Sequence, residues 1–151
     1  MSGAARKTAK ESFRLRPATT RDMPLIRRRA KAWRLDDERL AARQFLVAAE
    51  GDRVVGFGRI KPYENCWELG TVGVIPERRG GKVAGTLIRA LIRSFPARQV
   101  WITTDLTDYF RRYGFRARTK GPKELAEKIA CTCRVKGRQN CRIMLLARPG
   151  R

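Results

Sequence analysis

Residues 67–92, WELGTVGVIPERRGGKVAGTLIRALI, decide the fold. Apolar and small side chains alternate from Trp67 onward, as in a β-strand, and Pro76 ends the pattern because proline has no N–H to donate to a neighbouring strand. A short loop of charged residues and glycines follows. Apolar residues then recur at helical spacing, at Val83, Leu87, Ile88, Leu91 and Ile92. The sequence therefore predicts a strand, a basic glycine loop and an amphipathic helix.

The loop has the composition of an anion-binding site. The first turn of a helix carries unpaired N–H groups and the positive end of the helix dipole. Gly80 and Gly81 would let a phosphate approach the backbone, and Arg78, Arg79 and Lys82 would add mobile positive charge. A tight connection with solvated arginines would have the same local sequence, so the loop alone leaves both interpretations open.

The stretch resembles the acetyl-CoA-binding signature of the GNAT N-acetyltransferase superfamily, written Arg/Gln-x-x-Gly-x-Gly/Ala, in Val74, Pro76, Arg79, Gly80, Gly81 and Ala84. Arg79 takes the first position of the signature and Ala84 the last, while Lys82 replaces the middle glycine. Residues 108–115, DYFRRYGF, resemble the second motif of the family, a helix that ends in an aromatic residue, polar residues and Gly-Phe. The resemblance covers about residues 13–118, and the tail weakly resembles that of small N-acetylglutamate-synthase-like members.

The resemblance implies an α/β fold, with a mixed, mostly antiparallel sheet that is splayed open between its fourth and fifth strands and flanked by helices. It also implies acetyl-CoA as cosubstrate. Backbone N–H groups at Val72 and Val74 would bind the pantetheine arm and the thioester oxygen, and Gly73 would ease the bulge that directs them. The rest of the cofactor-binding set would be Arg79, Gly80, Gly81, Lys82, Ala84 and Gly85.

Proton transfer has two candidate residues, Glu68 and Tyr109. The chain has no histidine, so a carboxylate, tyrosine, thiol or water must act near neutral pH. Glu68 matches a position where many relatives carry an acid and would be the general base; alternatively it faces solvent or pairs with an arginine. Phe110 stands at the tyrosine position of the family, so either Tyr109 is the general acid or no tyrosine is.

The remaining pattern predicts the other elements. We expect a strand over 13–16, a helix from Thr19 or Thr20 to near Trp33, and a second short helix from Asp36 or Asp37 to near Arg43. Further strands are expected over 45–49, 54–60, 99–104 and 141–147, and a helix over 123–130. Gly56 and Gly58 indicate a close backbone approach or a bend, and the three tryptophans are expected in the core.

The net charge of the chain indicates which acceptors and partners it would attract. The chain has 35 Lys and Arg against 14 Asp and Glu, a net charge of +21, and residues 111–151 contain 13 basic and 2 acidic residues. So basic an enzyme would favour acidic acceptors, or acceptors on an anionic assembly such as the ribosome. The prediction is an acetyl-CoA-dependent N-acetyltransferase in which a primary amine of an amino acid or protein attacks the thioester directly. The alternative is a catalytically weak GNAT-fold protein that binds RNA, the ribosome or DNA through its arginine-rich surface.

Residues 1–12 are expected to be a disordered basic tail, and residues 13–148 one N-acetyltransferase domain. There is no signal peptide and no long apolar run, so we expect a cytoplasmic protein without membrane contact, as a monomer or homodimer. The spacing of Cys131, Cys133 and Cys141 is unusual for zinc, and we expect free thiols and no metal.

Overall fold

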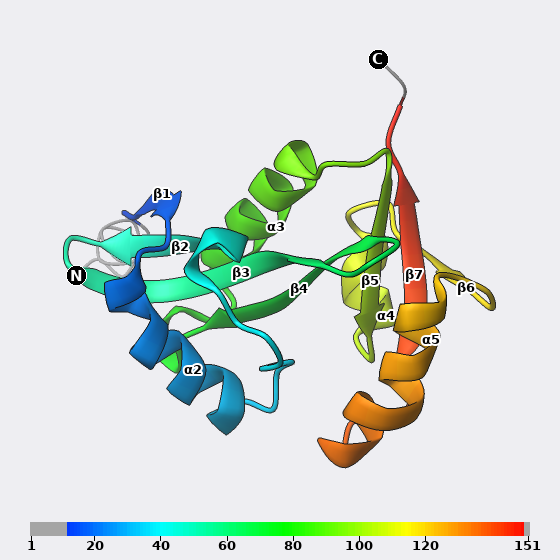
Figure 1. Ribbon diagram of the computed structural model, residues 1–151. Helices are drawn as coiled ribbons and strands as arrows, with labels where there is room; N and C mark the ends of the chain where they lie inside the picture. The colour runs from blue at the N-terminus through cyan, green and yellow to red at the C-terminus, as the bar shows by residue number, and fades with distance from the viewer. Residues whose placement is uncertain (1–11, 150–151) are drawn as a thin grey trace. The chain divides into compact units, whose positions relative to one another are not determined.

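The computed structural model describes residues 12–149 (Figure 1). Its elements in chain order are β1 (Arg14–Pro17), η1 (Thr20–Asp22), α2 (Met23–Ala32), η2 (Ala42–Gln44), β2 (Phe45–Glu50), β3 (Arg53–Pro62), β4 (Trp67–Val74), η3 (Pro76–Arg78), α3 (Val83–Ser94), β5 (Gln99–Thr104), α4 (Thr107–Arg111), β6 (Arg116–Arg118), α5 (Lys123–Lys128), η4 (Ile129–Cys133) and β7 (Arg142–Ala147).

The strands form one seven-stranded sheet in the order β1-β2-β3-β4-β5-β7-β6. β4 and β5 are parallel, whereas β1 with β2, β2 with β3, β5 with β7 and β6 with β7 pair antiparallel. In the described part of the chain, the register of β4 with β5 is set at one pair, Glu68 and Trp101. This mixed, mostly antiparallel sheet with flanking helices confirms the predicted fold class.

The chain divides into two compact units. The first contains the residues up to Arg59 together with Thr71–Leu91, and the second contains Ile60–Gly70 together with the residues from Ile92 onward. Of the predicted tail, residues 1–11 lie outside the described residues. A single domain over 13–148 stays a prediction. No helix in residues 12–149 is long and apolar enough to cross a membrane.

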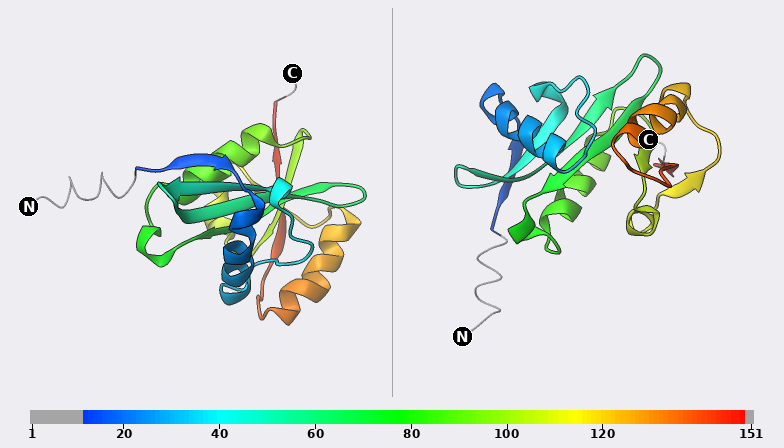
Figure 2. Two further views of the ribbon diagram at one scale, coloured as in Figure 1. Left: turned by 60° about the vertical axis from the view of Figure 1, so that its left-hand side comes forward. Right: turned by 90° about the horizontal axis from the view of Figure 1, so that it is seen from below.

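In the first unit, α2 and α3 lie on opposite faces of β2 and β3 (Figures 1 and 2). One cluster packs α2 on the strands through Met23, Ile26, Phe45, Val47, Val54 and Phe57. The other packs α3 on them through Ala48, Val55, Val74, Ile75, Val83 and Leu87. Burying apolar surface stabilises a fold by about 25 cal/mol per Å². The two clusters therefore hold β2 and β3 in place between α2 and α3.

Gly56 and Gly58 of β3 let α3 pack closely. A β-carbon at Gly56 would lie 2.7 Å from Val83 Cγ1, and one at Gly58 would lie 2.8 Å from Leu91 Cδ1. Both distances are shorter than carbon atoms tolerate. The close approach predicted from these two glycines is confirmed.

The predicted second short helix, from Asp36 or Asp37 to near Arg43, is wrong. Apart from the η2 turn, the segment is irregular. Arg39 has a φ angle of +50°, which lies outside the α-helical region. The Asp36 carboxylate also accepts a hydrogen bond from the Glu38 backbone N–H at 3.0 Å, and such local bonds compete with helix formation.

In the second unit, β7 lies between β5 and β6 and pairs with both (Figure 1). β6 was not predicted, because its three residues are all exposed and show no alternation of burial. The predicted helix over 123–130 is α5, which continues into the π-helical segment η4. This continuation places Lys128 at the junction of the two helical geometries.

Candidate active site

The loop after β4 has open space around Gly80. Gly80 has a φ angle of +80°, which favours glycine, and no heavy atom lies within 4 Å of the position that a β-carbon would take. Ala84 and Gly85 lie in the first turn of α3, where backbone N–H groups have no partner within the helix. The loop therefore offers an accessible backbone next to a helix N-terminus, as phosphate binding requires.

Two cations of the loop, Arg78 and Arg79, have different partners. Arg78 donates to both carboxylate oxygens of Glu50, at 2.5 and 2.6 Å, and its guanidinium lowers the pKa of Glu50. Arg79 Nε donates to the Val74 carbonyl at 2.8 Å, and its guanidinium carbon lies 4.9 Å from the centre of the Trp33 ring. The expectation that Arg78 adds mobile charge to the loop is corrected, because Arg78 is tied to β2. Arg79 is instead held against the end of β4.

Gly73 lies in a closely packed part of β4, and its role in easing a bulge stays a prediction. The positive φ angle in β4 belongs to Thr71, at +48°. A β-carbon at Gly73 would lie 2.8 Å from the Trp33 ring and 2.9 Å from Phe57, whose rings stack with centroids 6.0 Å apart. Gly73 therefore makes room for two aromatic rings, and the irregular backbone of β4 lies directly before Val72.

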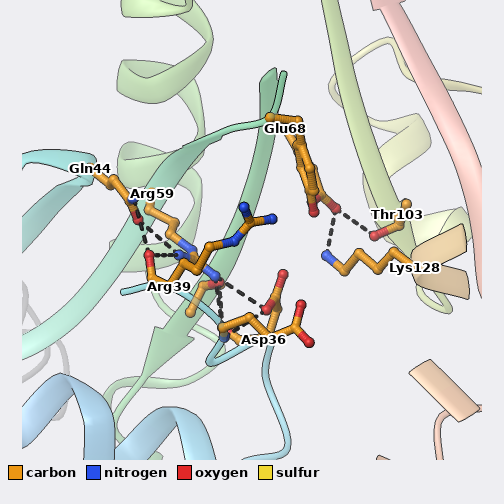
Figure 3. A network of polar contacts seen from close by, with 10 residues as sticks. Asp36, Arg39, Gln44, Arg59, Glu68, Thr103 and Lys128 are labelled. Atoms are coloured by element: carbon orange, nitrogen blue, oxygen red, sulfur yellow. Dashed lines mark hydrogen bonds and ion pairs between the residues drawn. The ribbon is translucent and has the colours of Figure 1, made fainter. Parts of the chain in front are cut away.

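Thr71 is bonded to a buried arginine, Arg59, which Figure 3 shows beside Asp36 and Gln44. The Thr71 hydroxyl accepts a hydrogen bond from Arg59 Nε at 2.8 Å and donates one to the Asp36 carbonyl at 2.9 Å. Arg59 is fully buried and also donates to Gln44 Oε1 at 2.8 Å and to the Asp36 carbonyl at 3.1 Å. Sequence reasoning missed Arg59; the available signal was a charged residue in a strand of apolar and small ones.

Glu68 lies at the centre of a second network (Figure 3). Its side chain is 1% exposed. Oε1 accepts a hydrogen bond from the Tyr63 hydroxyl at 2.9 Å, and Oε2 accepts one from the Thr103 hydroxyl at 2.5 Å. Lys128 Nζ also donates to Oε2, at 2.7 Å. Neither alternative for Glu68 holds, because it does not face solvent and its ion-pair partner is a lysine rather than an arginine.

Two of these three partners of Glu68 come from distant segments. Tyr63 lies 5 residues away along the chain, whereas Thr103 and Lys128 lie 35 and 60 residues away. The Asn65 backbone N–H and side-chain amide both donate to Glu124 Oε2, at 3.0 and 3.2 Å, which attaches α5 to the segment between β3 and β4. The contacts of Thr103 and Lys128 with Glu68 could not be predicted from the spacing of these residues in the sequence. The arrangement is a desolvated carboxylate that already binds an ammonium group.

Tyr109, the candidate general acid, lies on α4 beside a second phenol. Its hydroxyl is 2.9 Å from the Tyr113 hydroxyl, and the Arg112 guanidinium carbon lies 4.5 Å from the centre of its ring. Phe110, which stands at the tyrosine position of the family, is a core residue that packs edge-on against Phe115. The acid role of Tyr109 stays a prediction.

Trp67 is 40% exposed and lines an open cleft with Trp101 and Arg98, so the expectation that all three tryptophans are core residues is wrong for Trp67. The cysteines are free. Burial raises the pKa of the Cys133 thiol to about 12. Within residues 12–149, no group of three or more His, Cys, Asp or Glu side chains is placed to hold a metal ion.

Comparison with protein-family models matches residues 9–115 to the acetyltransferase (GNAT) family. The match covers more than half of the chain, and the fold agrees with it. The chain therefore belongs to the acetyltransferase (GNAT) family, whose acetyl donor is acetyl-CoA. A search of curated proteins gave no match.

Three solved structures illustrate the fold. A protein from Mycobacterium tuberculosis, crystallised in complex with CoA, is 23% identical with a TM-score of 0.69, over 89% of this chain and 98% of that one. N-acetylglutamate synthase from Neisseria gonorrhoeae, complexed with coenzyme A and N-acetyl-glutamate, is 18% identical with a TM-score of 0.74, over 92% of this chain but 36% of the synthase. A GNAT family acetyltransferase from Brucella melitensis, in complex with acetyl-CoA, is 24% identical with a TM-score of 0.60, over 92% and 90%.

Proposed function

We propose that this acetyltransferase transfers the acetyl group of acetyl-CoA directly to a primary amine, with Glu68 as the general base. One observation carries the proposal. The Glu68 carboxylate is 1% exposed and binds the Lys128 ammonium at 2.7 Å. A buried carboxylate that binds an alkylammonium group has the chemistry needed to bind an acceptor amine and to take its proton, directly or through water.

Acetyl-CoA is assigned to the end of β4 and the loop after it. The backbone N–H groups at Val72 and Val74 would bind the pantetheine arm and polarise the thioester carbonyl. The pyrophosphate would be bound by the cofactor-binding loop, composed of Arg79, Gly80, Gly81, Lys82, Ala84 and Gly85. The open backbone at Gly80 and the unpaired N–H groups of the first turn of α3 support this assignment.

The reaction needs three steps. Glu68 removes a proton from the acceptor ammonium, and the neutral amine attacks the thioester carbon. The tetrahedral intermediate then expels the thiolate of CoA. The attacking nitrogen gives up its second proton to water, and Tyr109 or a water molecule protonates the thiolate. No covalent enzyme intermediate forms, because the amine itself is the nucleophile.

The acceptor class is proposed from charge and from one structural neighbour. A net charge of +21 repels polycationic acceptors and attracts acidic ones. The Neisseria gonorrhoeae synthase was crystallised with N-acetyl-glutamate, an acetylated acidic amino acid. Acidic amino acids, and peptides with acidic N-termini, are therefore the first acceptors to test.

The test measures CoA thiol release from acetyl-CoA with a panel of such amines, using nucleic-acid-free protein. Glu68→Gln keeps the size of the side chain and removes the base, so we expect kcat to fall about 10²- to 10⁴-fold. Glu64→Gln is the matched control, because Glu64 is a nearby exposed carboxylate and should leave kcat unchanged. Equal turnover by the wild type and Glu68→Gln would contradict the role of Glu68.

A further inference from the structure

We infer that this protein binds single-stranded RNA in a groove of its second unit, in addition to the proposed acetyl transfer. The groove lies where β5 begins and β7 ends, and Figure 1 shows these two paired strands. None of the described residues that line the groove is assigned to acetyl transfer. The inference is therefore independent of the proposed function.

Two open clefts form the groove. One is lined by residues of β4 and β5 that include Trp67, Trp101 and Gln99. The other is lined by the end of α3 and the connection after it, including Arg93. The clefts share four lining residues, Ala97, Arg98, Ala147 and Arg148. All of these residues belong to the second unit, so the groove is a feature of one compact unit.

Arg148 fixes one wall of the groove. Its guanidinium donates hydrogen bonds to the carbonyls of Ile92, Phe95 and Ala97, at 2.9, 2.8 and 2.6 Å. Its backbone N–H donates to the Arg98 carbonyl at 2.9 Å. These bonds join the end of β7 to the connection between α3 and β5. A surface that is already ordered loses little conformational entropy when a ligand binds.

The groove combines aromatic rings with positive charge. Trp67 is 40% exposed and Trp101 is half-buried, while Arg93 and Arg98 are exposed. None of the described residues that line the groove is acidic. Unpaired bases stack on aromatic rings, and arginine binds phosphate through charge-assisted hydrogen bonds. The groove therefore has both of the groups that bind single-stranded nucleic acid.

Other occupants fit these groups less well. A second copy of the chain would bring the same arginines together with no carboxylate in the groove to pair with them. An acidic peptide would pair with the arginines but has no flat ring to stack on Trp67, and a duplex hides its bases. RNA is favoured over DNA because its 2′-hydroxyl can bond to the amide of Gln99, which is exposed in the groove.

The experiment measures binding of a fluorescein-labelled single-stranded RNA of about 12 nucleotides to the full-length, nucleic-acid-free protein, by fluorescence anisotropy in moderate salt. Trp67→Leu keeps an apolar side chain and removes the aromatic ring, so we expect the affinity to fall about tenfold. Trp67→Phe retains a ring and should keep most of the affinity. Equal affinities of these two variants for the RNA would overturn the inference.

The phosphate contact is tested through the salt dependence of binding. The logarithm of the affinity for a single strand falls with the logarithm of the salt concentration, with a slope of about 0.7 for each phosphate contact. Arg98→Gln should reduce the slope by about 0.7. Arg116→Gln is the matched control, because it removes an exposed arginine of β6 that lies outside the groove. Equal effects of the two substitutions would show that net charge alone binds the RNA, and would overturn the inference.

Competition identifies the occupant. Unlabelled single-stranded RNA should displace the probe, whereas duplex RNA, oligo-glutamate and DNA of the same sequence should compete more weakly. Competition by any of these three that equals that of the single-stranded RNA would overturn the inference. Self-association that Trp67→Leu abolishes would assign the groove to a second copy instead. Each of these results would leave acetyl-CoA binding and turnover, and thus the proposed function, unaffected.

Discussion

Thr71 has a φ angle of +48°, which is unfavourable for a β-branched residue and is stabilised by its hydroxyl group. The hydroxyl joins the fully buried guanidinium of Arg59 to the carbonyl of Asp36. The next residue, Val72, has one of the backbone N–H groups assigned to acetyl-CoA. The conformation of one threonine therefore determines how the end of β4 presents its donors.

Thr71→Val tests this role, because valine keeps the shape of threonine and lacks the hydroxyl. Arg59 Nε would lose its bond to the hydroxyl and the Asp36 carbonyl would lose one of its two donors, so we expect the free energy of unfolding to fall by about 1–3 kcal/mol. Urea denaturation measures this change, and acetyl-CoA titration measures the accompanying loss of affinity. Thr71→Ser is the control and should retain both properties. Equal behaviour of the two variants would show that the hydroxyl is not what holds β4.

At the scale of an element, the start of α2 depends on an ion pair. Asp22 accepts two hydrogen bonds from Arg16, at 2.8 and 3.0 Å, and one from the Thr19 backbone N–H at 2.7 Å. The Arg16 guanidinium is the main reason that the pKa of Asp22 is lowered to about 2, against the opposing effect of burial. Ionised Asp22 therefore stabilises the folded state.

The pH dependence follows from this shift. The contribution of Asp22 is fully present above its unfolded pKa near 3.8 and is lost as the pH falls through the folded value of about 2. Because Arg16 is partly exposed, we expect Asp22→Asn to lower the free energy of unfolding by about 1–2 kcal/mol at pH 7. Urea denaturation at pH 7 and near pH 2 should give a difference that shrinks in acid. A difference independent of pH would contradict the ion pair.

The glycine loop can be tested with a control elsewhere in the chain. Gly80 and Gly51 both have positive φ angles, and neither has a heavy atom within 4 Å of the position of a β-carbon. Gly80→Asp places a carboxylate in the proposed phosphate site, so we expect acetyl-CoA binding to weaken at least about tenfold, or 1.4 kcal/mol. Gly51→Asp introduces the same change in a hairpin turn and should leave the affinity unchanged. Equal affinities of the two variants for acetyl-CoA would contradict the assignment of the phosphate to this loop.

The elements that could be predicted from the sequence are those with a strong periodic pattern. The apolar positions of α3 and the alternation in β5 predicted both elements. The two glycines of β3 predicted a close approach or a bend, but not that α3 is the element that approaches. The irregular segment 34–41 could not be predicted, because its conformation depends on Arg59, a residue of β3 that is distant in sequence. β6 is too short and too exposed to give a pattern.

The candidate site was predictable only where its residues are neighbours in sequence. The proposed cofactor-binding loop is one continuous segment, so its motif was visible in the sequence. Glu68 was found as a lone carboxylate within a strand, but the identities of its partners depend on how β5 and α5 fold around it. Lys128 carried no signal, since in a chain with nine lysines a lysine at the end of a helix is ordinary.

At the scale of the whole molecule, the charge of +21 attracts every polyanion, including CoA and nucleic acids. Binding that arises from charge alone falls steeply with salt concentration, whereas a site with specific backbone donors retains its ligand. Binding in moderate salt therefore distinguishes the enzyme from a protein that binds RNA, the ribosome or DNA through its arginine-rich surface.

The most direct measurement is calorimetric titration of the nucleic-acid-free protein with acetyl-CoA and with desulfo-CoA in moderate salt, beside the Gly80→Asp variant. The account predicts saturable binding of one molecule per chain that survives the salt and weakens in the variant. Binding that disappears with salt, or that is the same in both proteins, would contradict the assignment of acetyl-CoA to the end of β4 and its loop.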